Sequence, residues 1–133
     1  MQTFLPLPDF KKSLECLDKK RLGNQVYREA VTLIRGGWVN HPASKMWRGY
    51  EYQLAEYIIA GCEVLAERGK PQEKLIEEMQ QPQSTLVNQD LPPWFGDERL
   101  HSSHRSNLLR KDYEHYSQFG WTETTSIPYY WPV

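Results

Sequence analysis

Apolar residues recur at helical spacing along this chain, and glycines end the first two of these stretches. The first stretch covers residues 13–34 and ends at Gly36-Gly37, and the second covers residues 46–68 and ends at Gly69. A spacing of three to four residues places the apolar side chains on one face of a helix. No segment of convincing length shows the period of two that a half-buried strand requires. The sequence therefore predicts an all-α fold.

Shorter segments complete the predicted organisation. We expect a short acidic helix over residues 72–80 and a last helix that begins at Asp97 or Glu98 and ends near residue 117. A long Pro-rich connector joins them, and an aromatic, extended tail follows the last helix. The prolines at the start of the chain make its first residues an extended lead-in. A length of 133 residues suits one domain, so we expect residues 1–133 to form a single compact domain of three to four helices.

Composition excludes several classes of protein. Cys16 and Cys62 are the only cysteines, and each falls in a predicted helix, which argues against a disulfide framework and a cysteine-based zinc site. No apolar window reaches the ~18 residues of a membrane span, and the N-terminus lacks the pattern of a signal peptide. We therefore expect a cytoplasmic protein that makes no membrane contact.

The formal net charge of −1 conceals an uneven distribution of charge. Residues 1–50 carry nine Lys and Arg against four Asp and Glu, residues 51–98 carry three against ten, and residues 99–133 carry four against three. A separated basic region can bind phosphates in an acidic protein, because its field acts over a Debye length of ~8 to 10 Å. The acidic middle segment is equally compatible with a solvated helix face. The charges permit a nucleic-acid binder without requiring one.

Two helical constellations are candidates for chemistry. In the first helix, Arg21, Gln25 and Arg28 lie along one edge with Glu29 beside them. Neighbouring cations can hold a carboxylate ionised as a general base, or the group can simply form salt bridges along the helix.

In the last helix, His101, His104 and Arg105 share one face. Three interpretations remain open. The residues can bind phosphates, can form a zinc site with Asp97 and His41, or can be buried histidines that hydrogen-bond to loop carbonyls.

Aromatic residues divide into two groups. Those at helical spacing, such as Trp47 and Tyr57, are expected in the core. Those outside any periodicity are better candidates for contacts with a base or a groove. The candidates are Trp121, Tyr129, Tyr130 and Trp131.

Tyr27-Arg28-Glu29 resembles a motif of the pyrimidine-dimer DNA glycosylases of the phage endonuclease V type, which are small and all-α. In that family a Leu-x-x-x-x-Leu helix precedes the motif, as Leu17 and Leu22 do here. Further similar motifs follow in the same order: residues 65–69, Asp90-Leu91-Pro92, Phe95-Gly96-Asp97, His101 and the aromatic tail. The chain also resembles a bacterial and phage branch of the family in residues 1–4, 20–23, 41–47 and 103–106.

The resemblance implies a glycosylase with linked lyase activity. An N-terminal α-amine attacks the sugar C1′, displaces the damaged base and forms an imine, and β-elimination then cleaves the strand. Such an amine must be neutral, and α-amino groups lose their proton more readily than lysine side chains do. Glu29 matches the family's catalytic glutamate, Arg28 matches an arginine that contacts phosphate, and Arg110 or Lys111 falls where another cation is expected.

The second residue departs from the family pattern. The type enzyme exposes Thr after loss of its initiator Met, whereas here Gln2 should block removal of Met1. Three alternatives follow: the Met1 amine is the nucleophile, the N-terminus is processed differently, or lyase chemistry is absent. Lys19, Lys20 and Lys45 are alternative amines.

The sequence therefore predicts a DNA-repair glycosylase and AP lyase that acts, as a monomer without metal or cofactor, on duplex DNA containing a pyrimidine dimer or a related damaged base. The predicted catalytic residues are Met1 and Glu29. The predicted DNA contacts are Arg21, Arg28, Lys45, Arg48, His101, His104, Arg105, Arg110 and Lys111, with Tyr129, Tyr130 and Trp131 at a base or groove. The alternatives are a non-catalytic nucleic-acid-binding module and a metal hydrolase built on His41, Asp97, His101 and His104.

Overall fold

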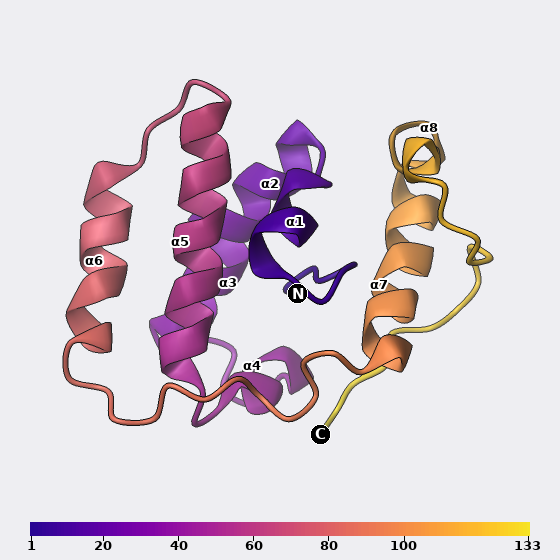
Figure 1. The fold of residues 1–133 in the computed structure, drawn as a ribbon. Helices are drawn as coiled ribbons and strands as arrows, with labels where there is room; N and C mark the ends of the chain where they lie inside the picture. The colour runs from indigo at the N-terminus through magenta and orange to yellow at the C-terminus, as the bar shows by residue number, and fades with distance from the viewer.

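The computed structural model describes residues 1–133, and all of its regular elements are helices. Helix α5 (Glu51–Glu67) lies at the centre, with α6 (Glu73–Gln83) along one side and α1 (Phe10–Glu15) along another (Figure 1). Helix α7 (Glu98–Lys111) stands apart from α5, and the N-terminal segment runs between them (Figure 1). The predicted all-α fold is confirmed.

The helix predicted over residues 13–34 is broken into two parts. Helix α1 ends at Glu15, and the chain resumes with α2 (Lys19–Asn24), a π-helix (Gln25–Glu29) and α3 (Ala30–Ile34). Asp18, at the break, has an extended backbone, and its carboxylate accepts hydrogen bonds from Arg21 and from the Tyr116 hydroxyl. The prediction of one continuous helix is therefore wrong. The local sequence did not show the break, because Tyr116, which stabilises it, comes from the far end of the chain.

The helix predicted over residues 46–68 is also divided. Its first part belongs to α4 (Pro42–Trp47), and α5 begins only at Glu51. Gly49 between them has a φ of 90°, a left-handed conformation that a helix cannot include. His41 caps α4, since its Nδ1 accepts from the Ala43 N–H at 3.0 Å. The prediction of a single helix is therefore wrong, and α4 begins at Pro42, before the predicted start.

The last two predicted helices also have different ends. Helix α6 continues through Pro82 to Gln83 instead of stopping at residue 80. Helix α7 stops at Lys111, and Asp112 then caps the short helix α8 (Tyr113–Tyr116) by accepting from the His115 N–H at 3.2 Å. A 3₁₀ turn (Ser117–Phe119) follows. The aromatic tail is irregular, as predicted.

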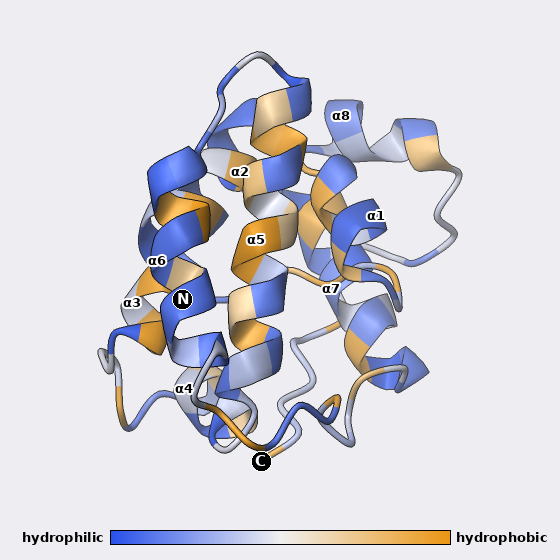
Figure 2. Ribbon diagram, turned by 60° about the vertical axis from the view of Figure 1, so that its left-hand side comes forward, coloured by the Kyte–Doolittle hydropathy of each residue, from blue (hydrophilic) through white to orange (hydrophobic).

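The core is a cluster of 26 buried apolar residues to which α5 contributes most heavily. Figure 2 shows apolar positions along α5 and a largely hydrophilic outer surface on α6. The tail lies on a polar face of α7, where Ser106 donates to the Thr124 carbonyl at 2.6 Å and Asn107 donates to the Ile127 carbonyl at 2.9 Å. No helix is both long enough and apolar enough to span a membrane.

Candidate functional site

The first residues of the chain are threaded through the core. Gln2, Thr3, Phe4 and Leu5 are at most 6% exposed. The Gln25 side chain donates to the Gln2 carbonyl at 2.8 Å and accepts from the Phe4 N–H at 3.1 Å. The sequence predicted an extended lead-in, but gave no sign that it would be buried.

Two other side chains continue this anchoring. The Tyr57 hydroxyl donates toward the Phe4 carbonyl at 2.8 Å and toward the Gln25 Oε1 at 2.9 Å. The Trp47 indole N–H donates to the Thr3 hydroxyl at 3.0 Å. Since three different helices supply these bonds, the position of the N-terminus is set by the whole fold.

Two histidines of α7 form hydrogen bonds with the same segment at Leu5. The His104 Nδ1 accepts from the Leu5 N–H at 2.8 Å, and the His101 Nδ1 lies 2.7 Å from the Leu5 carbonyl. The His101 Nε2 accepts from the Gly96 N–H at 3.0 Å, so His101 carries its proton on Nδ1 and donates it to Leu5. Burial lowers the pKa of both imidazoles, that of His104 to about 3.

These positions correct part of the predicted DNA interface. His101 and His104 are fully buried, so no phosphate can reach them. Arg105 is 11% exposed, donates to the Pro6 carbonyl at 2.8 Å, and pairs with Glu98 and Glu123. The helix face on which the sequence placed all three is covered by the N-terminal segment. The third interpretation, buried histidines bonded to a loop, is the one the structure supports.

Glu29 and the N-terminal amine lie close enough to influence the same imidazole. Burial and then the positive charge of the Met1 amine lower the pKa of His41, and Glu29 acts in the opposite direction. Gln25, which holds Gln2, is one turn before Glu29 in the π-helix. A π-helical turn is rare and is frequently found at functional sites. The structure therefore brings Met1, Glu29 and His41 into one region.

A small cavity of about 190 Å³ opens beside Glu29. Cations from both ends of the chain line it: Lys20, Arg21 and Lys111. Burial, followed by the charges of Arg21 and Arg110, lowers the pKa of Lys111. The basic N-terminal region and the end of α7 thus meet at a carboxylate, although they are some 90 positions apart in the sequence.

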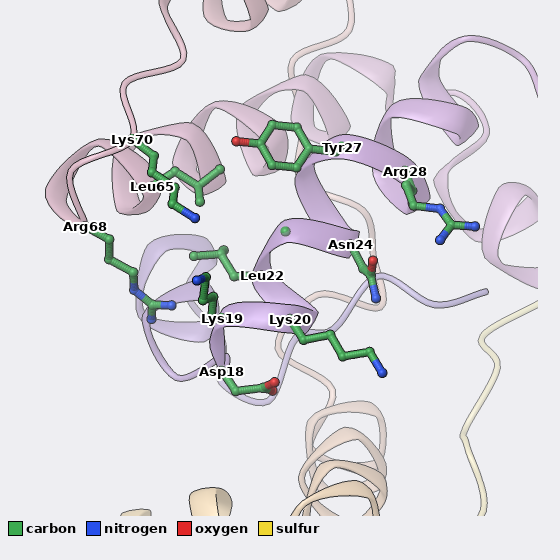
Figure 3. Close-up of a pocket in the computed structure, with 11 residues that line it drawn as sticks. Asp18, Lys19, Lys20, Leu22, Asn24, Tyr27, Arg28, Leu65, Arg68 and Lys70 are labelled. Carbon is green, nitrogen blue, oxygen red and sulfur yellow. The ribbon is translucent and has the colours of Figure 1, made fainter.

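A larger cavity of about 870 Å³ adjoins the first one, and the two share Lys20 and Asn24. Arg28, Asn24 and Lys20 lie on one side of it, and Lys19, Arg68 and Lys70 lie on the other (Figure 3). Arg68 and Lys70 were missed in the sequence because they follow the acidic helix α5. The feature of the sequence that could have identified them is their position just after a helix C-terminus, where cations are favoured.

The remaining predicted residues lie around this region in different ways. Lys45 and Arg48 are exposed on α4 and at its end. Tyr129 packs edge-on against His104, and burial raises the pKa of its hydroxyl to about 12. Trp131 packs edge-on against His41, with ring centroids 5.5 Å apart.

The two other predicted aromatic contacts point elsewhere. The Tyr130 ring lies under the Arg99 guanidinium at 4.5 Å, and Trp121 stacks on Tyr116 and Phe119. Of the predicted tail contacts, Trp131 packs against His41 and Tyr129 packs against Phe4, which lines the Glu29 cavity.

The residues proposed for a metal site do not form one. No three His, Cys, Asp or Glu side chains are placed to hold a metal ion. Both ring nitrogens of His101 are engaged, and Asp97 accepts from Arg99 through both carboxylate oxygens. The metal-hydrolase alternative therefore lacks its ligands.

The sequence profile of one protein family, described as pyrimidine dimer DNA glycosylase, matches residues 1–79. The chain belongs to this family. The match includes the buried N-terminus, the π-helix with Glu29, and His41. No curated protein and no solved structure matches the chain.

Membership makes this protein a DNA glycosylase that acts on damaged DNA in repair. A pyrimidine dimer DNA glycosylase needs a surface for the phosphate backbone and a reaction centre for the sugar. This glycosylase has two cation-lined cavities that share Lys20 and Asn24, and Glu29 lines the smaller one.

Proposed function

We propose that this glycosylase removes a base of a pyrimidine dimer with the α-amine of Met1 as nucleophile, and that it then cleaves the strand as a lyase. The observation that carries this proposal is the anchoring of Gln2 by Gln25, one turn before Glu29. An amine held in this way needs no further ordering before it attacks, which lowers the entropic part of the barrier.

The reaction begins when the neutral Met1 amine forms a bond to C1′. The bond between C1′ and the base nitrogen breaks, its electron pair stays on that nitrogen, and the nitrogen takes up a proton while the base remains joined to its neighbour in the dimer. Positive charge develops on the sugar as this bond breaks. A Glu29 carboxylate beside the sugar stabilises that charge, and it accepts the proton that the attacking nitrogen loses.

The sugar ring opens as Glu29 returns its proton to the ring oxygen O4′, which leaves C1′, and an imine forms between the Met1 nitrogen and C1′. Loss of a proton from C2′ then expels the 3′ phosphate by β-elimination, which breaks the strand. Glu29 is the carboxylate available to accept this second proton. Lys20, Arg21 and Lys111 line the same cavity, and Arg28 lines the adjoining one. In this proposal these cations contact the phosphates on either side of the lesion.

Borohydride reduction tests the imine directly, because it converts the intermediate into a stable covalent adduct. The assay uses duplexes that each contain one lesion: a pyrimidine dimer, an oxidised thymine or an abasic site. We expect an adduct and strand cleavage with the dimer, and an adduct with the abasic site. The Glu29→Gln variant should cleave the glycosidic bond about 10²-fold more slowly, or less readily still, while it still binds the dimer duplex.

The outcomes separate this function from a non-catalytic DNA-binding module. Such a module would bind the duplexes but give neither adduct nor product. Base release without an adduct would leave a glycosylase that lacks lyase chemistry. Full activity of Glu29→Gln would remove Glu29 from the mechanism.

A further inference from the structure

Trp38 is an exposed aromatic residue in a strained backbone conformation. It lies between α3 and α4, is 57% exposed, and has a φ of 56°. No other residue except glycine has a positive φ in this chain. A bulky side chain in the left-handed region is an outlier, and such residues persist where the surrounding structure holds them for a function.

Hydrogen bonds on both sides hold this loop in place. The Gly37 N–H donates to the Thr32 carbonyl at 2.9 Å, and the His41 N–H donates to the Trp38 carbonyl at 2.9 Å. The Arg48 guanidinium donates to the Val39 carbonyl at 2.7 Å. Val39, the next residue, is also 58% exposed. The loop therefore presents two apolar side chains to solvent from a fixed backbone.

The position of Trp38 connects it with the reaction centre. Its ring packs edge-on against His41 at 6.1 Å, and His41 packs edge-on against Trp131 at 5.5 Å. His41 is the imidazole on which both the Met1 amine and Glu29 act. Lys45 and Arg48, which have no carboxylate partner, are exposed on the adjacent helix. An apolar tip beside cations that no carboxylate neutralises matches a duplex, which offers stacked bases between phosphates.

We propose that Trp38 enters the base stack at the lesion and occupies the space that opens when the nucleotide opposite the damaged one is displaced, while the sugar of the damaged nucleotide is brought to Met1 and Glu29. An aromatic side chain recovers part of the stacking energy lost in that displacement, and apolar residues of other proteins wedge into base steps in this way. The inference rests on the proposed function, since it assigns Trp38 a role in the same reaction. Trp38 acts here as a positioning residue.

The test compares duplex and single-stranded substrates that contain the same pyrimidine dimer. A single strand has no opposite nucleotide to displace, so a wedge matters little there. Trp38→Gly should slow excision from the duplex by about tenfold or more and change excision from the single strand by less than about twofold. Trp38→Phe should retain most of the duplex activity. Tyr113→Ala, which removes another exposed aromatic residue, on α8, is the matched control and should behave like wild type.

Stability gives an independent check on Trp38→Gly. Glycine adopts a φ of 56° without strain, so this variant should melt at or above the temperature of the wild type. Equal losses on duplex and single strand would overturn the proposal, and so would undiminished duplex activity.

A second readout does not depend on catalysis. A 2-aminopurine placed opposite the dimer becomes fluorescent when it unstacks. Binding of the Glu29→Gln protein should raise this fluorescence, and binding of the Glu29→Gln, Trp38→Gly double variant should raise it much less. If the wild type releases no base from any substrate, the proposed function fails, but this signal still decides the role of Trp38. The same fluorescence rise with both proteins would overturn that role.

Discussion

Gln25 binds the main chain of Gln2 from the helical turn that carries Glu29. Its Nε2 donates to the Gln2 carbonyl at 2.8 Å, and its Oε1 accepts from the Phe4 N–H at 3.1 Å. Gln25 is 2% exposed, so water does not compete for these bonds. One buried carboxamide therefore links the path of the N-terminus to the π-helix.

Removal of this carboxamide should both destabilise and inactivate the protein. Gln25→Leu leaves the Gln2 carbonyl and the Phe4 N–H without their partner, and each unsatisfied buried group costs about 1 to 3 kcal/mol. We expect the free energy of unfolding to fall by about 3 kcal/mol, as measured by urea denaturation. At temperatures where the variant is still folded, imine trapping should fall further than the folded fraction does.

Gln80→Ala is the control for this change, since Gln80 is exposed on α6. It should alter the free energy of unfolding by less than about 0.5 kcal/mol. Wild-type trapping by folded Gln25→Leu would show that the carboxamide does not position Met1.

Extension of the N-terminus by one glycine should abolish trapping and leave the fold intact. The buried residues 2–5 are held by side chains of α4, α5, α7 and the π-helix, so the chain cannot slide to return an amine to the same place. Met1 itself is only partly buried, which leaves room for the addition. The melting temperature and the affinity for a dimer duplex should therefore change little. Adducts that persist after the extension would identify a lysine, such as Lys19, Lys20 or Lys45, as the nucleophile.

The sequence predicted the helical class because the apolar spacing that defines it is local. The breaks in the helices were missed because distant residues make them. Asp18, for example, bonds to Tyr116, which is 98 positions away. The site also shows that only local patterns can be predicted. Tyr27-Arg28-Glu29 and the cations near it are contiguous in the sequence, so a motif identified them.

The assignment of His101 and His104 to DNA contacts was wrong because a distant segment of the chain covers them. Their spacing placed them correctly on one face of α7, but nothing local shows that Leu5, more than 90 residues earlier, covers that face. Arg105 is withdrawn from solvent in the same way. Trp38 escaped notice because a strained φ leaves no mark on sequence periodicity.

Salt dependence should identify the cations that contact phosphates. Each phosphate that a duplex-binding protein neutralises contributes about −0.9 to the slope of log K against log salt concentration. Lys20→Ala and Lys111→Ala, each in the Glu29→Gln background to prevent turnover, should each make the slope shallower by about one. Lys74→Ala on the acidic helix α6 should leave it unchanged. A shallower slope for Lys74→Ala would place the duplex on another surface. An unchanged slope for Lys20→Ala and Lys111→Ala would do the same.

Stability should fall in mild acid because of His104. Burial lowers the pKa of its imidazole to about 3, whereas an exposed imidazole titrates near pH ~6.5. Between these values the unfolded chain binds a proton at His104 and the folded protein does not, so lowering the pH favours unfolding. One proton corresponds to about 1.4 kcal/mol per pH unit. Urea denaturation at pH 6.5 and pH 5.0 should therefore differ by about 1.6 kcal/mol from this group alone, because the unfolded imidazole is already half protonated at pH 6.5.

The choice of variant and pH window isolates the histidine. Burial lowers the pKa of His101 in the same direction, so it adds to the loss. Carboxylates with lowered pKa values, such as Asp18 and Glu123, lose their contribution only at lower pH. His104→Gln keeps an acceptor for the Leu5 N–H but cannot titrate. It should be less stable than wild type at pH 7, with a clearly weaker dependence on pH between 5.0 and 6.5. An unchanged pH dependence in His104→Gln would mean that the wild-type His104 imidazole gains its proton while the protein stays folded. The hydrogen bond from the Leu5 N–H would then be weaker than its length indicates.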